Sequence, residues 1–176
     1  MKKKILLVLL LPIIIIGLTG CGEKKDTRKS IKLADPVFGF ETVFKYDEKE
    51  NFTNIKTKEG GASKEISFEN SDLDVEFQMY YTKMSKTSYD KSKEIRANQK
   101  NYKEYKYGKY NAYAYGEYSS GLYLNILLGV DSTDTAKILF VSIDRLDTNE
   151  DVIVANVLDK DLKDFFNSIE VNEIDG

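Results

Sequence analysis

Apolar and polar side chains alternate along much of the chain, and this period-two pattern predicts β-strands. The segment 73–81 is the clearest case, because its apolar residues fall on one face and its acidic residues on the other. The segments 122–130 and 137–143 are long and rich in aliphatic residues, as central strands are. Shorter strands are predicted at 43–46, 52–55, 64–68, 104–107 and 110–118.

Two segments have helical spacing instead. Residues 88–100 are mostly charged, and Ser88 is available to cap their first turn. Nearer the C-terminus, Thr148 and Asp151 fit a capping box. The apolar residues that follow recur at helical intervals: Leu158, Leu162, Phe165, Phe166 and Ile169. We expect this stripe to lie on the sheet, so the pattern predicts an α+β domain in which helices flank an antiparallel β-sheet.

The first twenty residues have the layout of an export signal. Three lysines, from Lys2 to Lys4, precede an apolar run from Ile5 to Leu18 that Pro12 interrupts. This run is 14 residues long, whereas a membrane-spanning helix needs about 20 apolar residues. The run is therefore too short to span a membrane, and we expect it to be removed as a signal peptide.

The motif that ends this segment, Leu18-Thr19-Gly20-Cys21, resembles the lipobox of bacterial lipoproteins. The resemblance implies cleavage before Cys21 and attachment of lipid to its thiol, on the extracytoplasmic face of the cell membrane. Two or three acyl chains would anchor firmly, whereas one alone is marginal. We expect a signal peptide at 1–20, a lipidated N-terminus with a flexible, lysine-rich tether at 21–36, and a single folded domain at 37–176. The alternative is an ordinary signal peptide in which the cysteine is accidental.

Composition narrows the chemistry of the exported part. Removal of residues 1–20 takes away three of the 26 basic residues and none of the 29 acidic ones, which leaves a formal net charge of −6. An acidic domain is poorly suited to a phosphate backbone, so we expect no nucleic-acid partner. The chain has no His, and Cys21 is its single Cys, which excludes Ser-His-Asp and Cys-His catalysis and metal sites built on those residues. No glycine-rich phosphate loop is present, and we expect no cofactor.

The predicted elements follow one another in a distinctive order. Strands and a helix precede a Tyr/Ala hairpin at 107–115, two long strands and a closing helix at 161–171. Over most of residues 40–172, this order resembles that of PsbP/Mog1-like domains, versions of which are common in Gram-positive lipoproteins. The resemblance implies an α+β fold. Characterised members are mostly not enzymes and dock onto protein complexes or small GTPases, which implies a docking role.

Tyrosine is concentrated in one stretch, with seven residues between positions 102 and 118. On a hairpin, Tyr113 and Tyr115 would share one face, while Ala112 and Ala114 would lie on the other. We expect a helix to pack on the alanine face and the tyrosine face to form an amphipathic surface for a protein or glycan. The predicted partner-binding residues are Tyr107, Tyr110, Tyr113 and Tyr115. The alternative is that tyrosine is present because it favours strands and cross-strand pairs.

Carboxylates are the remaining candidates for metal binding or acid-base catalysis. Asp72, Asp74 and Glu76 alternate along one predicted strand and would share its polar face. They could bind Ca²⁺ or act as an acid and base pair, and the alternative is a solvated strand face. A second polar group is expected near the ends of the two long strands: Asp131, Asp134, Asp144, Asp147 and Asn149. Neither group has the spacing of a calcium-binding loop, and we predict no metal site.

Together these features predict a non-catalytic, membrane-anchored binding domain that docks onto an envelope protein partner. Three alternatives stay open. The first is a structural or ligand-carrying lipoprotein, which an enclosed apolar pocket would favour. The second is an immunity or exclusion lipoprotein that sequesters a toxin or peptide. The third is a carboxylate-dependent enzyme acting on cell-wall glycans, which a carboxyl pair about 5–10 Å apart in a groove would favour.

Overall fold

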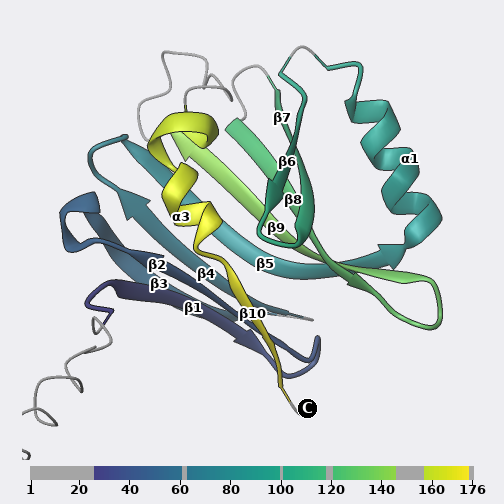
Figure 1. Cartoon of the computed structure of the whole chain (residues 1–176), viewed down its shortest axis with the longest axis horizontal. Coiled ribbons are helices and arrows are strands. Elements are labelled where there is room, and N and C mark those ends of the chain that lie inside the picture. Colours follow the sequence, from purple (N-terminus) through teal and green to yellow (C-terminus); the bar gives the residue numbers. More distant parts are fainter. Residues whose placement is uncertain (1–25, 61–62, 100, 118–120, 146–156, 175–176) are drawn as a thin grey trace, which may run out of the picture.

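The computed structural model describes residues 26–60, 63–99, 101–117, 121–145 and 157–174. Of these residues, 60% lie in strands and 18% in helices, and the strands form two antiparallel sheets (Figure 1). The expectation of an α+β, PsbP/Mog1-like domain whose sheet is flanked by helices is therefore wrong, because the fold is predominantly β. The reason is length: several strands extend beyond their predicted ends, whereas the helical segments are short.

The smaller sheet has the strand order β1-β2-β10. Its strands are β1 (Lys29–Asp35), β2 (Phe40–Tyr46) and β10 (Glu170–Glu173). Strand β1 lies within the expected tether at 21–36, so the tether expectation is wrong for residues 29–35. Ile31 and Leu33 alternate with exposed residues and are buried, and this short alternation explains the strand.

The larger sheet has the strand order β3-β4-β5-β9-β8-β7-β6, and all neighbouring strands are antiparallel. Its strands are β3 (Phe52–Gly60), β4 (Ser63–Asn70), β5 (Val75–Ser85), β6 (Lys103–Tyr107), β7 (Tyr110–Glu117), β8 (Gly121–Val130) and β9 (Thr135–Arg145). A short 3₁₀ turn, η1 (Glu48–Glu50), leads from β2 to β3. Every strand predicted from the sequence overlaps a strand of the structure, so these predictions are confirmed.

Helix α1 (Lys86–Arg96) follows β5 directly. It begins at Ser85, whose hydroxyl oxygen accepts a hydrogen bond from the Ser88 backbone N–H at 3.1 Å. This confirms the helix predicted at 88–100, which begins and ends slightly earlier than predicted. The prediction that Ser88 caps the first turn is wrong, because the capping residue is Ser85. No helix within the described ranges is long and apolar enough to cross a membrane.

The C-terminal helix is shorter than predicted. It consists of a π-helical turn, η2 (Val157–Asp161), and the short helix α3 (Lys163–Asn167). The capping residues Thr148 and Asp151 lie outside the described residues. The predicted apolar stripe is buried, as expected: Leu158, Leu162, Phe165, Phe166 and Ile169. After α3 the chain turns back and joins the smaller sheet as β10.

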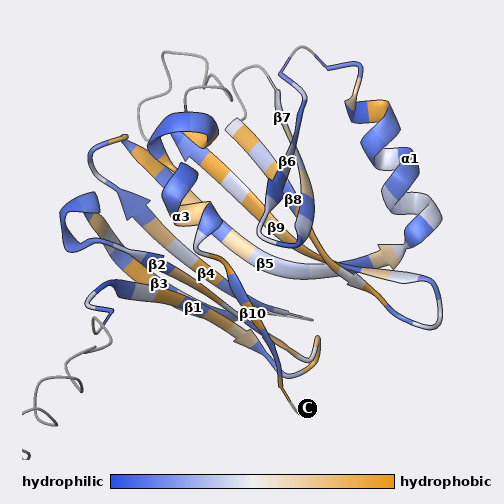
Figure 2. Cartoon of the chain, in the orientation of Figure 1, coloured by the Kyte–Doolittle hydropathy of each residue, from blue (hydrophilic) through white to orange (hydrophobic). Residues whose placement is uncertain are grey.

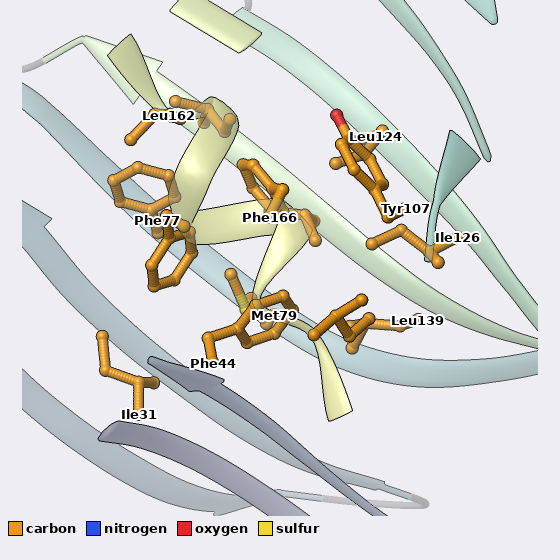
Figure 3. Packing of buried hydrophobic residues seen from close by; sticks show 14 of the residues in the cluster. Ile31, Phe44, Phe77, Met79, Tyr107, Leu124, Ile126, Leu139, Leu162 and Phe166 are labelled. Carbon is orange, nitrogen blue, oxygen red and sulfur yellow. The ribbon is translucent and has the colours of Figure 1, made fainter. Parts of the chain in front are cut away.

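The main core lies between the larger sheet, the smaller sheet and α3 (Figures 1 and 3). Phe44 of β2 stacks on Phe165 of α3, with ring centroids 4.9 Å apart, and Phe68 stacks on Phe77 at 4.6 Å. Figure 2 shows the alternation of hydrophobic and hydrophilic residues along the strands that creates this core. We call the face of the larger sheet that lines this core its inner face, and the opposite face its outer face.

Two buried polar groups join the sheets. The Tyr81 hydroxyl on β5 hydrogen-bonds to the Leu33 carbonyl oxygen at 2.8 Å and to the Thr42 hydroxyl at 2.7 Å, both on the smaller sheet. The carboxylate of Asp35, at the end of β1, accepts a hydrogen bond from the Lys64 backbone N–H at 2.8 Å. These bonds hold β1 and β2 against β4 and β5. The smaller sheet therefore covers the inner face of the larger sheet and not its outer face.

Candidate functional site on the outer face of the larger sheet

The four tyrosines predicted to bind a partner lie in the interior. Their exposed fractions are 3% for Tyr107, 8% for Tyr110, 2% for Tyr113 and 8% for Tyr115. Tyr107 and Tyr110 belong to the main core, whereas Tyr113 and Tyr115 belong to a second cluster with residues of α1 and β9. None of the four forms an open contact surface, so the prediction of a tyrosine platform at these positions is wrong.

The two faces of β7 have the opposite roles to those predicted. Its alanine face lies in the main core, and α1 packs on its tyrosine face. The Tyr89 ring of α1 lies 5.5 Å from the Tyr113 ring, and the Arg96 guanidinium lies 4.4 Å from the centroid of the Tyr115 ring. Burial raises the pKa of the Tyr89 and Tyr113 hydroxyls, as expected for phenols removed from water.

The line of rings continues past α1 across the outer face. Tyr123 of β8 lies 5.3 Å from Tyr115, Phe140 of β9 lies 5.8 Å from Tyr123, and Tyr80 of β5 lies 5.0 Å from Phe140, measured between ring centroids. Tyr80, Phe140 and Tyr123 are half-buried, and we call these three residues the aromatic row. Neither Tyr80 nor Phe140 stands out in the sequence, because only the pairing of β5 with β9 brings their rings together.

A carboxylate adjoins one end of the aromatic row. Glu65 of β4 lies directly opposite Tyr80. Burial raises the pKa of the Tyr80 hydroxyl, and the negative charge of Glu65 raises it further. The hydroxyl therefore stays protonated and can both donate and accept a hydrogen bond.

A second row, made of carboxylates, crosses the same face. Glu76 of β5 lies directly opposite Glu69 of β4 on one side and Asp144 of β9 on the other. We call these three residues the carboxylate row. Asp144 accepts a hydrogen bond from the Ser142 hydroxyl at 2.8 Å, and Glu69 accepts one from the Asn54 side-chain amide at 2.7 Å. No lysine or arginine of the described ranges forms a salt bridge with the row.

Gly121 makes room for the carboxylate at the end of this row. It has a φ of +97°, a conformation that residues with a side chain rarely adopt. A Cβ atom at this position would also collide with the Asp144 carboxylate. Glycine is therefore required here both for the backbone and for the placement of Asp144.

Asn125 is a buried polar residue on the outer face. It lies directly opposite Phe140 on one side and Tyr113 on the other, and is 6% exposed. Its side-chain Nδ2 has no hydrogen-bond acceptor in the described part of the chain. An amide donor without an acceptor is unfavourable for stability. The atom is fully covered by its neighbours, so it adds no exposed donor to this face.

The carboxylates predicted to alternate on one strand are divided between a turn and a strand. Glu76 lies on β5 as predicted, whereas Asp72 and Asp74 lie in the turn between β4 and β5. Asp74 has a left-handed φ of 53°, and Asp72 accepts a hydrogen bond from the Asn51 side-chain amide at 2.8 Å. Asp72 and Asp74 thus shape the chain around this turn and do not share a strand face with Glu76.

Asp131 stabilises the turn between β8 and β9. The Thr133 hydroxyl and the backbone N–H groups of Thr133 and Thr135 donate to its carboxylate and lower its pKa. Asp147 and Asn149, which were grouped with it on sequence position, lie outside the described residues. Across the described ranges, no three acidic side chains are close enough together to hold a metal ion.

Two open cavities, of about 400 and 540 Å³, lie at the end of the molecule formed by the β1–β2 and β8–β9 turns. Both are lined by Asp131 and Lys137, and the smaller one also by Lys109 and Glu173. Two lysines therefore meet two carboxylates in the smaller cavity. This balance of charge favours no particular class of ligand, unlike the outer face of the larger sheet.

Comparison with known proteins gives no family. No family model matches this chain, and no curated protein or solved structure matches it. The interpretation of function therefore rests on the residues of this chain alone.

Proposed function

We propose that this protein is a lipid-anchored, non-catalytic binding domain on the outer face of the cell membrane, and that the outer face of its larger sheet docks onto an envelope protein partner. The aromatic row supports this proposal best. Its three rings lie side by side and are only half-buried, and aromatic side chains are enriched at protein interfaces because they bury a large area with few rotatable bonds.

The proposed anchor rests on the resemblance of Leu18-Thr19-Gly20-Cys21 to a lipobox. Strand β1 starts at Lys29, eight residues after Cys21. Eight extended residues reach at most about 29 Å, so β1 would begin within that distance of the membrane surface. Components of the cell envelope lie within this reach, and we therefore look for the partner among envelope proteins.

The arrangement of the carboxylates favours binding over catalysis. A carboxylate-dependent glycosidase needs two carboxyl groups that flank a bond held in a groove. Here the carboxylate row crosses a sheet face, with its members directly opposite one another on adjacent strands. Such a face offers a broad contact area for a partner and does not enclose a substrate bond.

The proposal can be tested by site-specific photo-crosslinking in living cells. A photoreactive phenylalanine analogue would replace Phe140 on the outer face or, as a control, Ile95, which is 59% exposed on α1. We expect one envelope protein to be captured from position 140 and not from position 95. The double variant Tyr80→Ala, Tyr123→Ala should lose this capture, and Cys21→Ala should lose it through mislocalisation.

Two results would count against the proposal. Equal capture from positions 140 and 95 would show that contact with the outer face is not selective. Absence of any captured protein from position 140, with the anchored protein present at its normal level, would exclude docking through this face.

A further inference from the structure

The carboxylate row is unfavourable for folding in the absence of a ligand. Like charges that lie directly opposite each other on adjacent strands repel, and Glu76 has such a neighbour on both sides. Lys56 and Lys58 of β3 lie directly opposite Ser67 and Glu65 of β4, towards the edge of the same face. Neither lysine forms a salt bridge with the row in the described ranges. The negative charge of the row is therefore available to a cation from another molecule.

We infer that the outer face binds a cationic, extended segment of the protein partner, with lysine or arginine side chains over the carboxylate row and the aromatic row. This inference rests on the proposed docking function and specifies the chemistry of the partner. Carboxylates attract ammonium and guanidinium groups, and the faces of tyrosine and phenylalanine rings attract them as well. A metal ion is a poorer candidate, because the described carboxylates do not form a metal-binding group.

The spacing of the two rows specifies the spacing of the cations. Glu76 and Tyr80 are four residues apart on β5, which corresponds to about 13 Å along a strand. Residues i and i+4 of an extended segment aligned with β5 span the same distance and point to the same side. One cation at position i would lie over the carboxylate row, and another at position i+4 would lie over the rings of Tyr80 and Phe140.

Two further groups complete this surface. Gln78 and Ser142 lie directly opposite each other between the two rows, where side chain i+2 of the segment would lie. The side-chain amide of Gln78 can donate a hydrogen bond to a backbone carbonyl of the bound segment. The face thus offers acceptors for cations and a donor for a peptide carbonyl.

The inference can be tested with two peptides of identical composition. Both are blocked at their ends and fluorescently labelled. The first, Lys-Ser-Thr-Ser-Lys-Ser-Thr-Ser-Lys, places its lysines at i, i+4 and i+8 on one side of an extended chain. The second, Lys-Ser-Thr-Lys-Ser-Thr-Lys-Ser-Ser, places them on alternating sides. Binding to the full-length lipoprotein in phosphatidylcholine nanodiscs would be measured by fluorescence anisotropy at low ionic strength, with empty nanodiscs as the blank.

We expect the first peptide to bind roughly five-fold more tightly than the second, because only the first can contact both rows at once. The double variant Glu76→Gln, Asp144→Asn should weaken binding of the first peptide by roughly five- to ten-fold. Its matched control, Glu173→Gln on β10, should leave the affinity unchanged. Added salt should weaken binding, since exposed charges are screened.

Several outcomes would overturn the inference. Equal affinity for the two peptides would show that the spacing of the lysines does not matter. An unchanged affinity in the Glu76→Gln, Asp144→Asn variant would show that the carboxylate row does not contribute to binding. Binding of the neutral oligosaccharide chitohexaose in place of both peptides would identify a glycan surface instead. Capture from position 140 in cells tests docking separately: if capture succeeds and the peptides fail, docking stands and the cationic segment does not.

Discussion

Glu76 on β5 lies directly opposite Asp144 on β9, and neither carboxylate forms a salt bridge with a basic residue of the described ranges. This relationship is destabilising for an isolated sheet. It lies on the proposed docking surface, where a cationic partner segment would require negative charge at the expense of stability.

Neutralising Glu76 should therefore stabilise the folded state. We expect Glu76→Gln to raise the free energy of unfolding by about 0.5–1 kcal/mol, because it removes two repulsive cross-strand pairs. Urea denaturation followed by circular dichroism measures this change. Glu173→Gln, on the exposed end of β10, serves as the control and should have little effect. A loss of stability in Glu76→Gln would contradict the interpretation that the carboxylate row is frustrated.

Gly121 should tolerate no side chain. We expect Gly121→Ala to lower the free energy of unfolding by about 1–3 kcal/mol, because alanine is strained at a φ of +97°. The new methyl group would also displace the Asp144 carboxylate, so the affinity for the cationic peptide should fall. Gly129→Ala on the same strand is a matched control, since a Cβ there meets no atom within 4 Å. Equal stability of the two variants would contradict the steric argument.

Asp35 should contribute strongly to stability through the hydrogen bonds of its carboxylate. Its carboxylate accepts hydrogen bonds from the backbone N–H groups of Val37 at 3.0 Å and Lys64 at 2.8 Å. Asp35→Ala would leave both donors without this acceptor, which we expect to cost roughly 2–4 kcal/mol. Asp35→Asn keeps one acceptor oxygen and should cost less. Thermal unfolding of both variants measures the difference, and equal melting temperatures would show that these bonds are replaced by water.

Alkaline pH should unfold the domain through its buried tyrosines. Burial raises the pKa of the Tyr81 and Tyr107 hydroxyls above the ordinary value, whereas the unfolded chain ionises near pH 10. Above about pH 10 the unfolded state therefore binds fewer protons than the folded state, so stability falls as the pH rises, by up to about 1.4 kcal/mol per pH unit for each group. Below pH 10 this contribution is complete. Absorbance at 295 nm and circular dichroism should change together, and ionisation of these tyrosines in a folded protein would contradict the prediction.

Tyr113 should act on stability and not on binding. Its ring is buried under α1, so Tyr113→Ala should cost about 3–5 kcal/mol through the loss of buried area and the cavity it leaves. Tyr113→Phe keeps the ring and loses only a long hydrogen bond to Ser92, so it should be nearly neutral. Capture of the partner from position 140 should persist in Tyr113→Phe. Loss of capture in this variant would show that Tyr113 takes part in binding the partner.

The strands could be predicted because alternation is a local property of the sequence. The segments around Phe77 and Leu124 place apolar residues on every second position, and both are buried on the inner face. Alternation does not say which face a helix covers. For Tyr113 and Tyr115 the assignment was reversed, because small alanines suit a tight sheet core as well as a helix contact. The aromatic row was missed for a related reason, since its members come from three separate strands.

Two strands at the ends of the domain, β1 and β10, were not predicted for a different reason. Strand β1 carries only two buried apolar residues, Ile31 and Leu33, within a lysine-rich stretch, so composition suggested a tether. Strand β10 is four residues long and its residues are half-buried or exposed. Both strands are stabilised by pairing with β2. Strand β1 is next to β2 in the sequence, so its lysine-rich composition was what hid it. Strand β10 is far from β2 in the sequence, so its pairing leaves no local signal.

The pairing of β1 with β2 also determines how the domain would respond to mechanical load. The two strands pair over their full length, from Lys29 opposite Tyr46 to Asp35 opposite Phe40. A pull transmitted from Cys21 along the axis of β1 would load these pairs in shear, so that they would resist together and would not separate one at a time. In the proposed lipid-anchored form, the domain would therefore be a force-bearing link between the membrane and the partner proposed for its outer face.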